Sequence, residues 1–168
     1  YQPVLSATRR FRVSELPYIF TNGIHGAYVE VDTDTGFIRL LKHWVVEDCG
    51  RLINPNLADE QVRGGCVQGL GGALYEHCLY DENGQLLNGS MADYLTPMAA
   101  EMPDIEVGHI ETPTSESELG AKGAGESGTG AAPGVVMCAV NNALRPFGAV
   151  VTAQPITPEV VLQALGRI

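Results

Sequence analysis

A glycine-rich segment near the C-terminal end of the chain carries two isolated charged side chains. Residues 119–130 read LGAKGAGESGTG, so that small residues surround Lys122 and Glu126. A long segment without regular structure inside a compact domain is typically functional or mobile. A carboxylate among small residues can act as a general base, and a dry pocket can raise its pKa toward neutrality. These residues indicate Glu126 as a candidate base beside a cation, with capping of the next helix as the alternative role.

Other catalytic templates fit this segment less well. Gly123, Gly125 and Gly128 match the dinucleotide-binding spacing, but residues 114–119 read TSESEL, which is not the apolar strand that should precede it. Ser127 lacks the final glycine of a nucleophile elbow. A nucleotide-binding domain therefore remains only as an alternative. The histidines show no ligand spacing, and we predict no protein ligand for a metal among His25, His43, His77 and His109.

The elements around this segment predict an α+β fold. Residues 27–32 and 37–46 alternate in polarity about a turn at 34–36, as in a hairpin. Asn54 and Pro55 begin a helix that we expect to reach about Cys78. We also expect a strand over 103–110 and helices over 135–144 and 159–165. The predicted architecture is a mixed β-sheet packed by helices on one side.

The predicted helix after Asn54 has two distinct faces. One face should pack on the sheet and consists of Val62, Cys66, Leu70, Ala73 and Leu74. A second stripe consists of Gln61, Gly65, Gln68 and Gly72. Because glycine inside a helix costs up to about 1 kcal/mol relative to alanine, we expect something to approach this backbone closely. Tight packing on the sheet is the alternative explanation for the glycines.

Charge and cysteine content exclude several classes of protein. The chain has 168 residues and a net charge of −10, and residues 64–121 contain ten acidic residues and no basic one. Such a surface repels phosphate backbones, so we predict no nucleic-acid partner. No apolar run approaches about 20 residues, so we predict no membrane span. Four scattered cysteines indicate a reducing, cytoplasmic location, and we expect Cys66 and Cys138 to be small core residues.

Four collinear motifs resemble the C-terminal segment of the large subunit of molybdenum hydroxylases, the family of xanthine dehydrogenase, aldehyde oxidase and carbon monoxide dehydrogenase. They are VVEDCGRLINP at 45–55, EQVRGGCVQGLG at 60–71, KGAGESGTG at 122–130 with the helix that follows, and QPITP at 154–158. The resemblance covers residue 25 to the end. It implies that residues 1–24 are a lead-in segment of a longer chain and that 25–168 form the C-terminal part of a larger molybdopterin-binding domain.

The resemblance also implies roles for single residues. Glu126 matches the family's catalytic glutamate, which takes a proton from a hydroxyl on molybdenum so that the oxygen attacks an electron-poor carbon of an aldehyde or N-heterocycle. Gln61 matches a glutamine that hydrogen-bonds the pterin. Lys122, Gly123 and Gly125 are expected beside the cofactor. No protein ligand to molybdenum is expected, because the metal in this family is held by its pterin dithiolene and by small ligands.

The remaining implications concern cofactors and partners. The family binds molybdenum-molybdopterin, with the cytosine dinucleotide form expected here, and passes electrons to [2Fe-2S] and FAD on partner subunits or domains. The upstream cofactor-binding segments are not recognisable in this sequence, so we expect the isolated chain to be inactive and to self-associate through apolar surface that the rest of the large subunit covers. A non-catalytic assembly module of the same family remains the alternative function.

Overall fold

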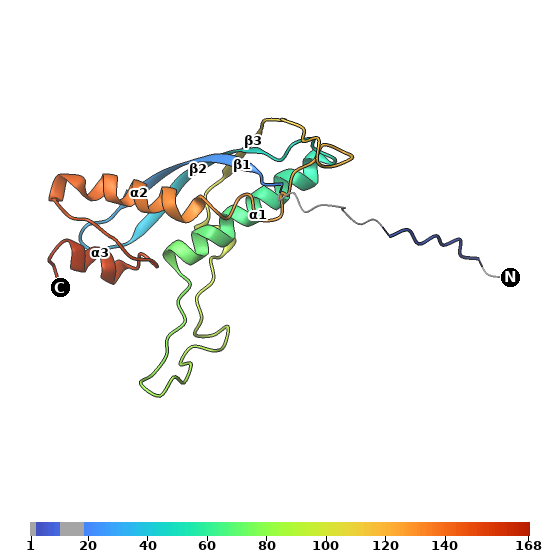
Figure 1. Cartoon of the computed structure of the whole chain (residues 1–168). Coiled ribbons are helices and arrows are strands. Elements are labelled where there is room, and N and C mark those ends of the chain that lie inside the picture. Colours follow the sequence, from blue (N-terminus) through green and yellow to red (C-terminus); the bar gives the residue numbers. More distant parts are fainter. Residues whose placement is uncertain (1–2, 11–18) are drawn as a thin grey trace.

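The computed structural model describes residues 3–10 and 19–168. A three-stranded sheet in the order β1-β2-β3 forms one layer, and helices α1 and α2 lie against one face of it (Figure 1). This α+β arrangement with a mixed sheet confirms the predicted fold class. The lead-in segment predicted for 1–24 lies partly outside the described residues, and β1 begins within it at Asn22.

The first two strands form the predicted hairpin. Strand β1 (Asn22–Val31) pairs antiparallel with β2 (Ile38–Asp48). The turn closes because Asp32 accepts hydrogen bonds at Oδ1 from the amides of Asp34 (2.8 Å) and Thr35 (3.2 Å). Gly36 has φ +76°, a conformation that L side chains rarely adopt. Aspartate and glycine therefore set the register that brings β2 into the centre of the sheet.

Helix α1 (Pro55–Leu74) connects β2 to β3 (Ile105–His109), which pairs parallel to β2. Its first turn is capped by Asn54, whose Oδ1 accepts from the amide of Leu57 at 3.3 Å. The helix ends at Leu74, so its predicted extension to Cys78 is wrong. The backbone leaves helical geometry at Tyr75 (φ −128°), where the amides of Tyr75 and Glu76 both donate to the Gly71 carbonyl.

The C-terminal part of the chain supplies the second and third helices. Helix α2 (Ala132–Leu144) begins three residues earlier than predicted, because Pro133 suits its first turn. Short 3-10 turns occur at η1 (Ala99–Glu101) and η2 (Arg145–Phe147). Helix α3 (Pro158–Ala164) is capped as predicted by Thr157, whose hydroxyl accepts from the amide of Val160 at 3.4 Å.

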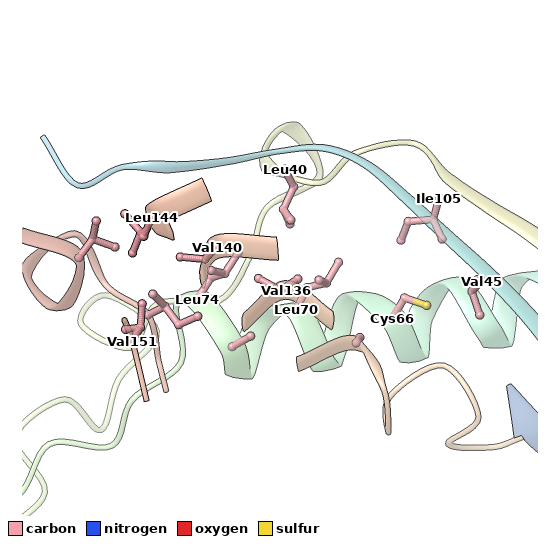
Figure 2. Close-up of a cluster of buried hydrophobic side chains, with 14 of the residues drawn as sticks. Leu40, Val45, Cys66, Leu70, Leu74, Ile105, Val136, Val140, Leu144 and Val151 are labelled. Atoms are coloured by element: carbon pink, nitrogen blue, oxygen red, sulfur yellow. The ribbon is translucent and has the colours of Figure 1, made fainter. Parts of the chain in front are cut away.

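The core lies between the sheet and the two longer helices. Figure 2 shows Leu40 of β2, Leu70 of α1 and Val136 of α2 meeting in this layer. The predicted inner face of α1 is confirmed, since each member is at most 6% exposed: Val62, Cys66, Leu70, Ala73 and Leu74. Cys138 is exposed and the prediction for it is wrong, because Val136, Val140 and Leu144 form the buried stripe of α2 instead.

Most of residues 75–104, the segment between α1 and β3, projects away from this body as an arm (Figure 1), while Tyr75 and Met102 near its ends pack against the core. Asn88 ties the base of the arm together, accepting from the Leu79 amide (2.9 Å) and donating to the His77 carbonyl (2.6 Å). The predicted turn at 81–84 is present, with Gly84 at φ +79°. No helix in the described part of the chain is both long and apolar enough to cross a membrane.

The cap of α1 gives a test of how the helix is fixed. Replacing Asn54 with Ala should lower the free energy of unfolding by about 1 kcal/mol, because the Leu57 amide loses its acceptor. Chemical denaturation of the full-length protein measures this change. Asn56→Ala is the matched control, since Asn56 is exposed in the first turn and alanine favours the helix. An equal loss in both variants would contradict the capping role.

Candidate active site around Glu126

The segment before α2 is fastened to the end of β2 by backbone hydrogen bonds. The Lys122 amide donates to the Cys49 carbonyl at 2.8 Å, and the Arg51 amide donates to the Gly120 carbonyl at 3.0 Å. Gly120 has φ +72°. Residues 120–122 therefore run beside 49–51, and the segment with Glu126 starts from a fixed position next to the sheet.

The ammonium of Lys122 is held by Asp48 rather than by Glu126. Lys122 Nζ lies 3.1 Å from Asp48 Oδ2, and the two side chains are only 12% and 14% exposed. The sequence placed a cation beside Glu126, but no ion pair joins the two among the described residues. The expected contact of Lys122 with a cofactor stays a prediction, and the side chain already has this structural partner.

The Asp48 carboxylate joins three segments of the chain at the end of β2. Its Oδ1 accepts from the amides of Gly50 (2.9 Å) and Thr112 (3.1 Å) while Oδ2 faces Lys122. Hydrogen bonds from Thr112, followed by those from Gly50 and Lys122, hold the pKa of this carboxyl well below its usual range. The sequence alone indicates no role for Asp48, because two of its partners, Thr112 and Lys122, lie more than sixty residues away in the chain.

The turn that carries Glu126 rests on the backbone of α1. A Cβ at Gly128 would overlap the Val62 carbonyl oxygen and lie 2.8 Å from the Cys66 amide nitrogen. A Cβ at Gly65 would lie 3.1 Å from the Gly128 Cα, and Thr129 Oγ1 donates to the Gly65 carbonyl at 3.1 Å. The close approach predicted for α1 is thus made by this turn. Packing on the sheet, the alternative, does not explain Gly65.

Gln61 adds a side-chain tie to the same turn. Its Nε2 donates to the Gly125 carbonyl at 2.7 Å. Within the turn, Ser127 Oγ donates to the Ala124 carbonyl (3.0 Å) and the Thr129 amide donates to the Glu126 carbonyl (3.1 Å). Gln61 was predicted from the resemblance to contact a pterin, and the structure shows it at the edge of the glycine-rich turn. Gln68 is exposed on the same helix.

Glu126 itself is exposed at the tip of this turn. Its carboxylate has no hydrogen bond or ion pair to any residue of 3–10 or 19–168. The proposed alternative, a glutamate cap on α2, is wrong: the N-cap is Ala131, and no described side chain caps the helix. The backbone of the turn is therefore fixed while the carboxylate is left free to contact a ligand.

The glycines beside Glu126 differ in their surroundings. The Gly123 amide donates to the Ile19 carbonyl at 3.3 Å, next to a bridge between Gly123 and Phe20. A Cβ on Gly125 would meet no described atom within 4 Å. Both glycines are exposed. The Gly125 side of the turn is open, whereas Gly123 lies beside the chain that leads into β1.

Three potential metal ligands that sequence spacing did not indicate meet beneath this turn. His25, His43 and Cys66 each place one ligand atom within 4.8 Å of the others. They come from β1, β2 and α1, so only the strand register and the helix orientation bring them together. Alternation along the two strands could have placed both histidines on the inner face, but not opposite Cys66.

Residues 2–103 match the molybdopterin cofactor-binding domain family. The chain is 45% identical over 164 residues to the nicotine 6-hydroxylase large subunit of Paenarthrobacter nicotinovorans, covering 98% of this chain and 20% of that protein. It is 33% identical over 126 residues to the carbon monoxide dehydrogenase large chain of Afipia carboxidovorans, covering 75% of this chain and 15% of that one. The chain therefore spans about a fifth or less of the length of these curated relatives.

Solved structures agree with this assignment. Quinoline 2-oxidoreductase from Pseudomonas putida 86 superposes with a TM-score of 0.84 at 42% identity, over 87% of this chain and 19% of that one. Aldehyde oxidoreductase from Desulfovibrio gigas gives a TM-score of 0.76 at 28% identity, over 87% and 15% of the two chains. The chain belongs to the molybdopterin cofactor-binding domain family, and its relatives are large subunits of molybdenum hydroxylases.

The contact between the turn and α1 predicts that Gly128 does not tolerate a side chain. Gly128→Ala should lower the free energy of unfolding by about 1–3 kcal/mol, because the new Cβ overlaps backbone that cannot rotate away. Gly130→Ala is the matched control, since a Cβ there meets no described atom within 4 Å. Denaturant unfolding of the full-length protein measures both. Equal stability of the two variants would contradict the contact.

The lowered pKa of Asp48 predicts a pH dependence of stability. A carboxyl whose pKa is depressed on folding stabilises the fold above its unfolded pKa, and this contribution is lost as pH falls through the folded value. Asp48→Asn should therefore be less stable than the unsubstituted protein at roughly pH 6, and the difference should shrink below about pH 4. Unfolding curves across this range measure it. Glu82→Gln, at an exposed position, should show no such change; a pH-independent difference for Asp48→Asn would contradict the account.

Proposed function

We propose that this chain is the C-terminal, catalytic portion of the large subunit of a molybdenum hydroxylase, with Glu126 as its proton acceptor. The observation that carries the proposal is the exposed, unpartnered carboxylate of Glu126 on a turn whose backbone is fixed against α1. A base must reach its proton without competing for an internal partner. Family membership supports a molybdopterin-dependent oxidation as the reaction that uses it.

The residues around the turn suit a bound molybdopterin. Among the described residues, none accepts a hydrogen bond from the backbone amides of Gly125 and Glu126. The open Gly125 side lets a flat, polar ligand approach the backbone, and Gln61 stands beside it. When bound, the cofactor supplies the two-electron redox chemistry. In this proposal Gln61, Gly123 and Gly125 hold it, and Lys122 contributes positive charge nearby while remaining paired with Asp48.

The chain's own contribution is a positioned proton acceptor. A Glu126 carboxylate oxygen takes the proton released as the substrate is oxidised at the cofactor, and the fixed turn orients that oxygen before substrate arrives. Gly125 and Gly128 add no bulk beside it. Glu126 is exposed in this chain. In this proposal the rest of the large subunit excludes water from it.

The substrate class that we propose is an electron-poor N-heterocycle. The relatives named for nicotine and quinoline share 45% and 42% identity with this chain, against 33% for the carbon monoxide dehydrogenase large chain. An aldehyde remains the second substrate class, supported by the structural match to an aldehyde oxidoreductase. In this proposal the segments that line the substrate pocket belong to the part of the large subunit that this chain, about a fifth of those relatives' length, does not span.

We also propose the partners that the relatives' names suggest. Several relatives are named as large subunits or as one subunit of a complex. In this proposal electrons pass to [2Fe-2S] and FAD on partner subunits or domains. The cofactor is proposed to be the cytosine dinucleotide form, and the enzyme to be cytoplasmic. The exposed apolar side chains of the arm are suited to burial by the remaining large subunit, among them Leu87, Met91, Leu95 and Met98.

Replacing Glu126 with Gln in the assembled enzyme tests the proposal. The amide keeps the size of the side chain but cannot take a proton, so kcat should fall by roughly a hundredfold or more. Molybdenum content and the unfolding curve should stay unchanged. Glu118→Gln, another exposed glutamate of the same segment, is the matched control and should retain full activity. Unchanged turnover in Glu126→Gln would instead favour a non-catalytic assembly module.

A further inference from the structure

A cluster of buried polar side chains lies between the sheet and α1, behind the turn that carries Glu126. The His25 side chain is 1% exposed, and His43 and Cys66 are fully buried. Each residue comes from a different element, namely β1, β2 and α1, and their potential ligand atoms all lie within 4.8 Å of one another. Nothing in the proposed oxidation reaction uses these residues.

The two histidines belong to a hydrogen-bonded chain that is incomplete at one end. His25 Nδ1 lies 3.1 Å from His43 Nε2, and His25 Nε2 lies 3.2 Å from Glu47 Oε1. Thr21 Oγ1 donates to Glu47 Oε2 at 3.1 Å. The other ring nitrogen of His43, Nδ1, is buried with no hydrogen-bond partner in the described part of the chain, and it is not the nitrogen that faces His25.

We propose that His25, His43 and Cys66 form a three-ligand site for a divalent, borderline-soft cation of the zinc type. Two imidazole nitrogens and one sulfur are the donor set that such cations prefer. Ligand atoms around tetrahedral zinc stand roughly 3.3–3.8 Å apart, given bonds of about 2.0–2.3 Å. The histidine nitrogens at 3.1 Å are slightly closer than this spacing. The Cys66 sulfur lies within 4.8 Å of them and has to approach by up to about 1 Å.

The surroundings of the cluster suit a bound cation. Glu47 contacts the second nitrogen of His25, which is the outer carboxylate that commonly orients a metal-binding histidine. The Glu47 side chain is 2% exposed, and a Cβ on Gly23 would overlap its carboxylate. One carboxylate and one thiolate together balance the charge of a dication, so the loaded site carries no net buried charge.

Such a site would join the three elements that position the turn. Cys66 lies in the stretch of α1 whose backbone contacts Gly128, so a bond from its sulfur to the cation fixes that stretch to β1 and β2. The proposal stands apart from the proposed oxidation, because it concerns the stability of the scaffold and needs no molybdenum.

Cobalt(II) is the probe that tests the site directly. The full-length subunit, prepared without molybdenum cofactor and stripped with a chelator, is titrated with Co²⁺ alone. We expect thiolate-to-cobalt charge-transfer absorption that saturates at about one cobalt per chain and is displaced by Zn²⁺. Cys66→Ala and His43→Ala should lose it. The matched controls Cys138→Ala and His77→Ala, at exposed positions, should keep it.

Absence of the absorption, or its survival in Cys66→Ala, would overturn the proposal and leave an ordinary buried hydrogen-bond network. A second measurement covers variants that fail to fold. The unsubstituted subunit is alkylated in mild denaturant with and without Zn²⁺, and labelling of each cysteine is mapped by mass spectrometry. Zn²⁺ should slow labelling of Cys66 by at least about tenfold more than that of Cys49, the other buried thiol. Equal protection of the two would overturn the proposal.

Discussion

Contact between two stretches of backbone holds this site together: the turn at Gly128 lies directly on the carbonyl of Val62 and the amide of Cys66 in α1. The contact requires glycine on both sides, at Gly128 and at Gly65, and it explains why a buried helix contains residues that weaken helices. Because this contact and the bond from Gln61 to Gly125 fix the turn through its main chain, the side chain of Glu126 is not used for anchoring. A carboxylate can then be presented at a defined place without a protein partner.

The charged groups near this turn are also arranged so that the Glu126 carboxylate stays unpaired. Lys122 is paired with Asp48, whose other oxygen accepts from two amides, so Lys122 does not draw Glu126 into an ion pair. Both members of that pair are largely buried, and their role is to fasten the segment to the end of β2. Asp48 and Lys122 therefore have a structural role, because their ion pair holds the loop. The Glu126 carboxylate remains available to contact a ligand.

The elements were predictable where the signal is local. Polar alternation and the turn at 34–36 define the hairpin, and the cap at Asn54 with a buried stripe defines α1. The end of α1 was missed because the competing hydrogen bonds at Gly71 form only once the chain turns into the arm. The partners of Asp48 and the meeting of His25, His43 and Cys66 depend on strand register and on the placement of helices. These contacts between distant residues cannot be derived from a single sequence. The resemblance to molybdenum hydroxylases nevertheless indicated Glu126 and Gln61 as site residues.

An experimental structure of the complete large subunit with its molybdenum cofactor bound tests the central claim most directly. Its decisive quantity is the position of the Glu126 carboxylate relative to the cofactor and to protein cations. We expect Gly128 to lie against the Val62 carbonyl. We also expect a Glu126 carboxylate oxygen to face the reactive side of the cofactor at hydrogen-bond distance. A Glu126 carboxylate paired with a lysine or arginine, or a turn lifted from α1, would contradict it.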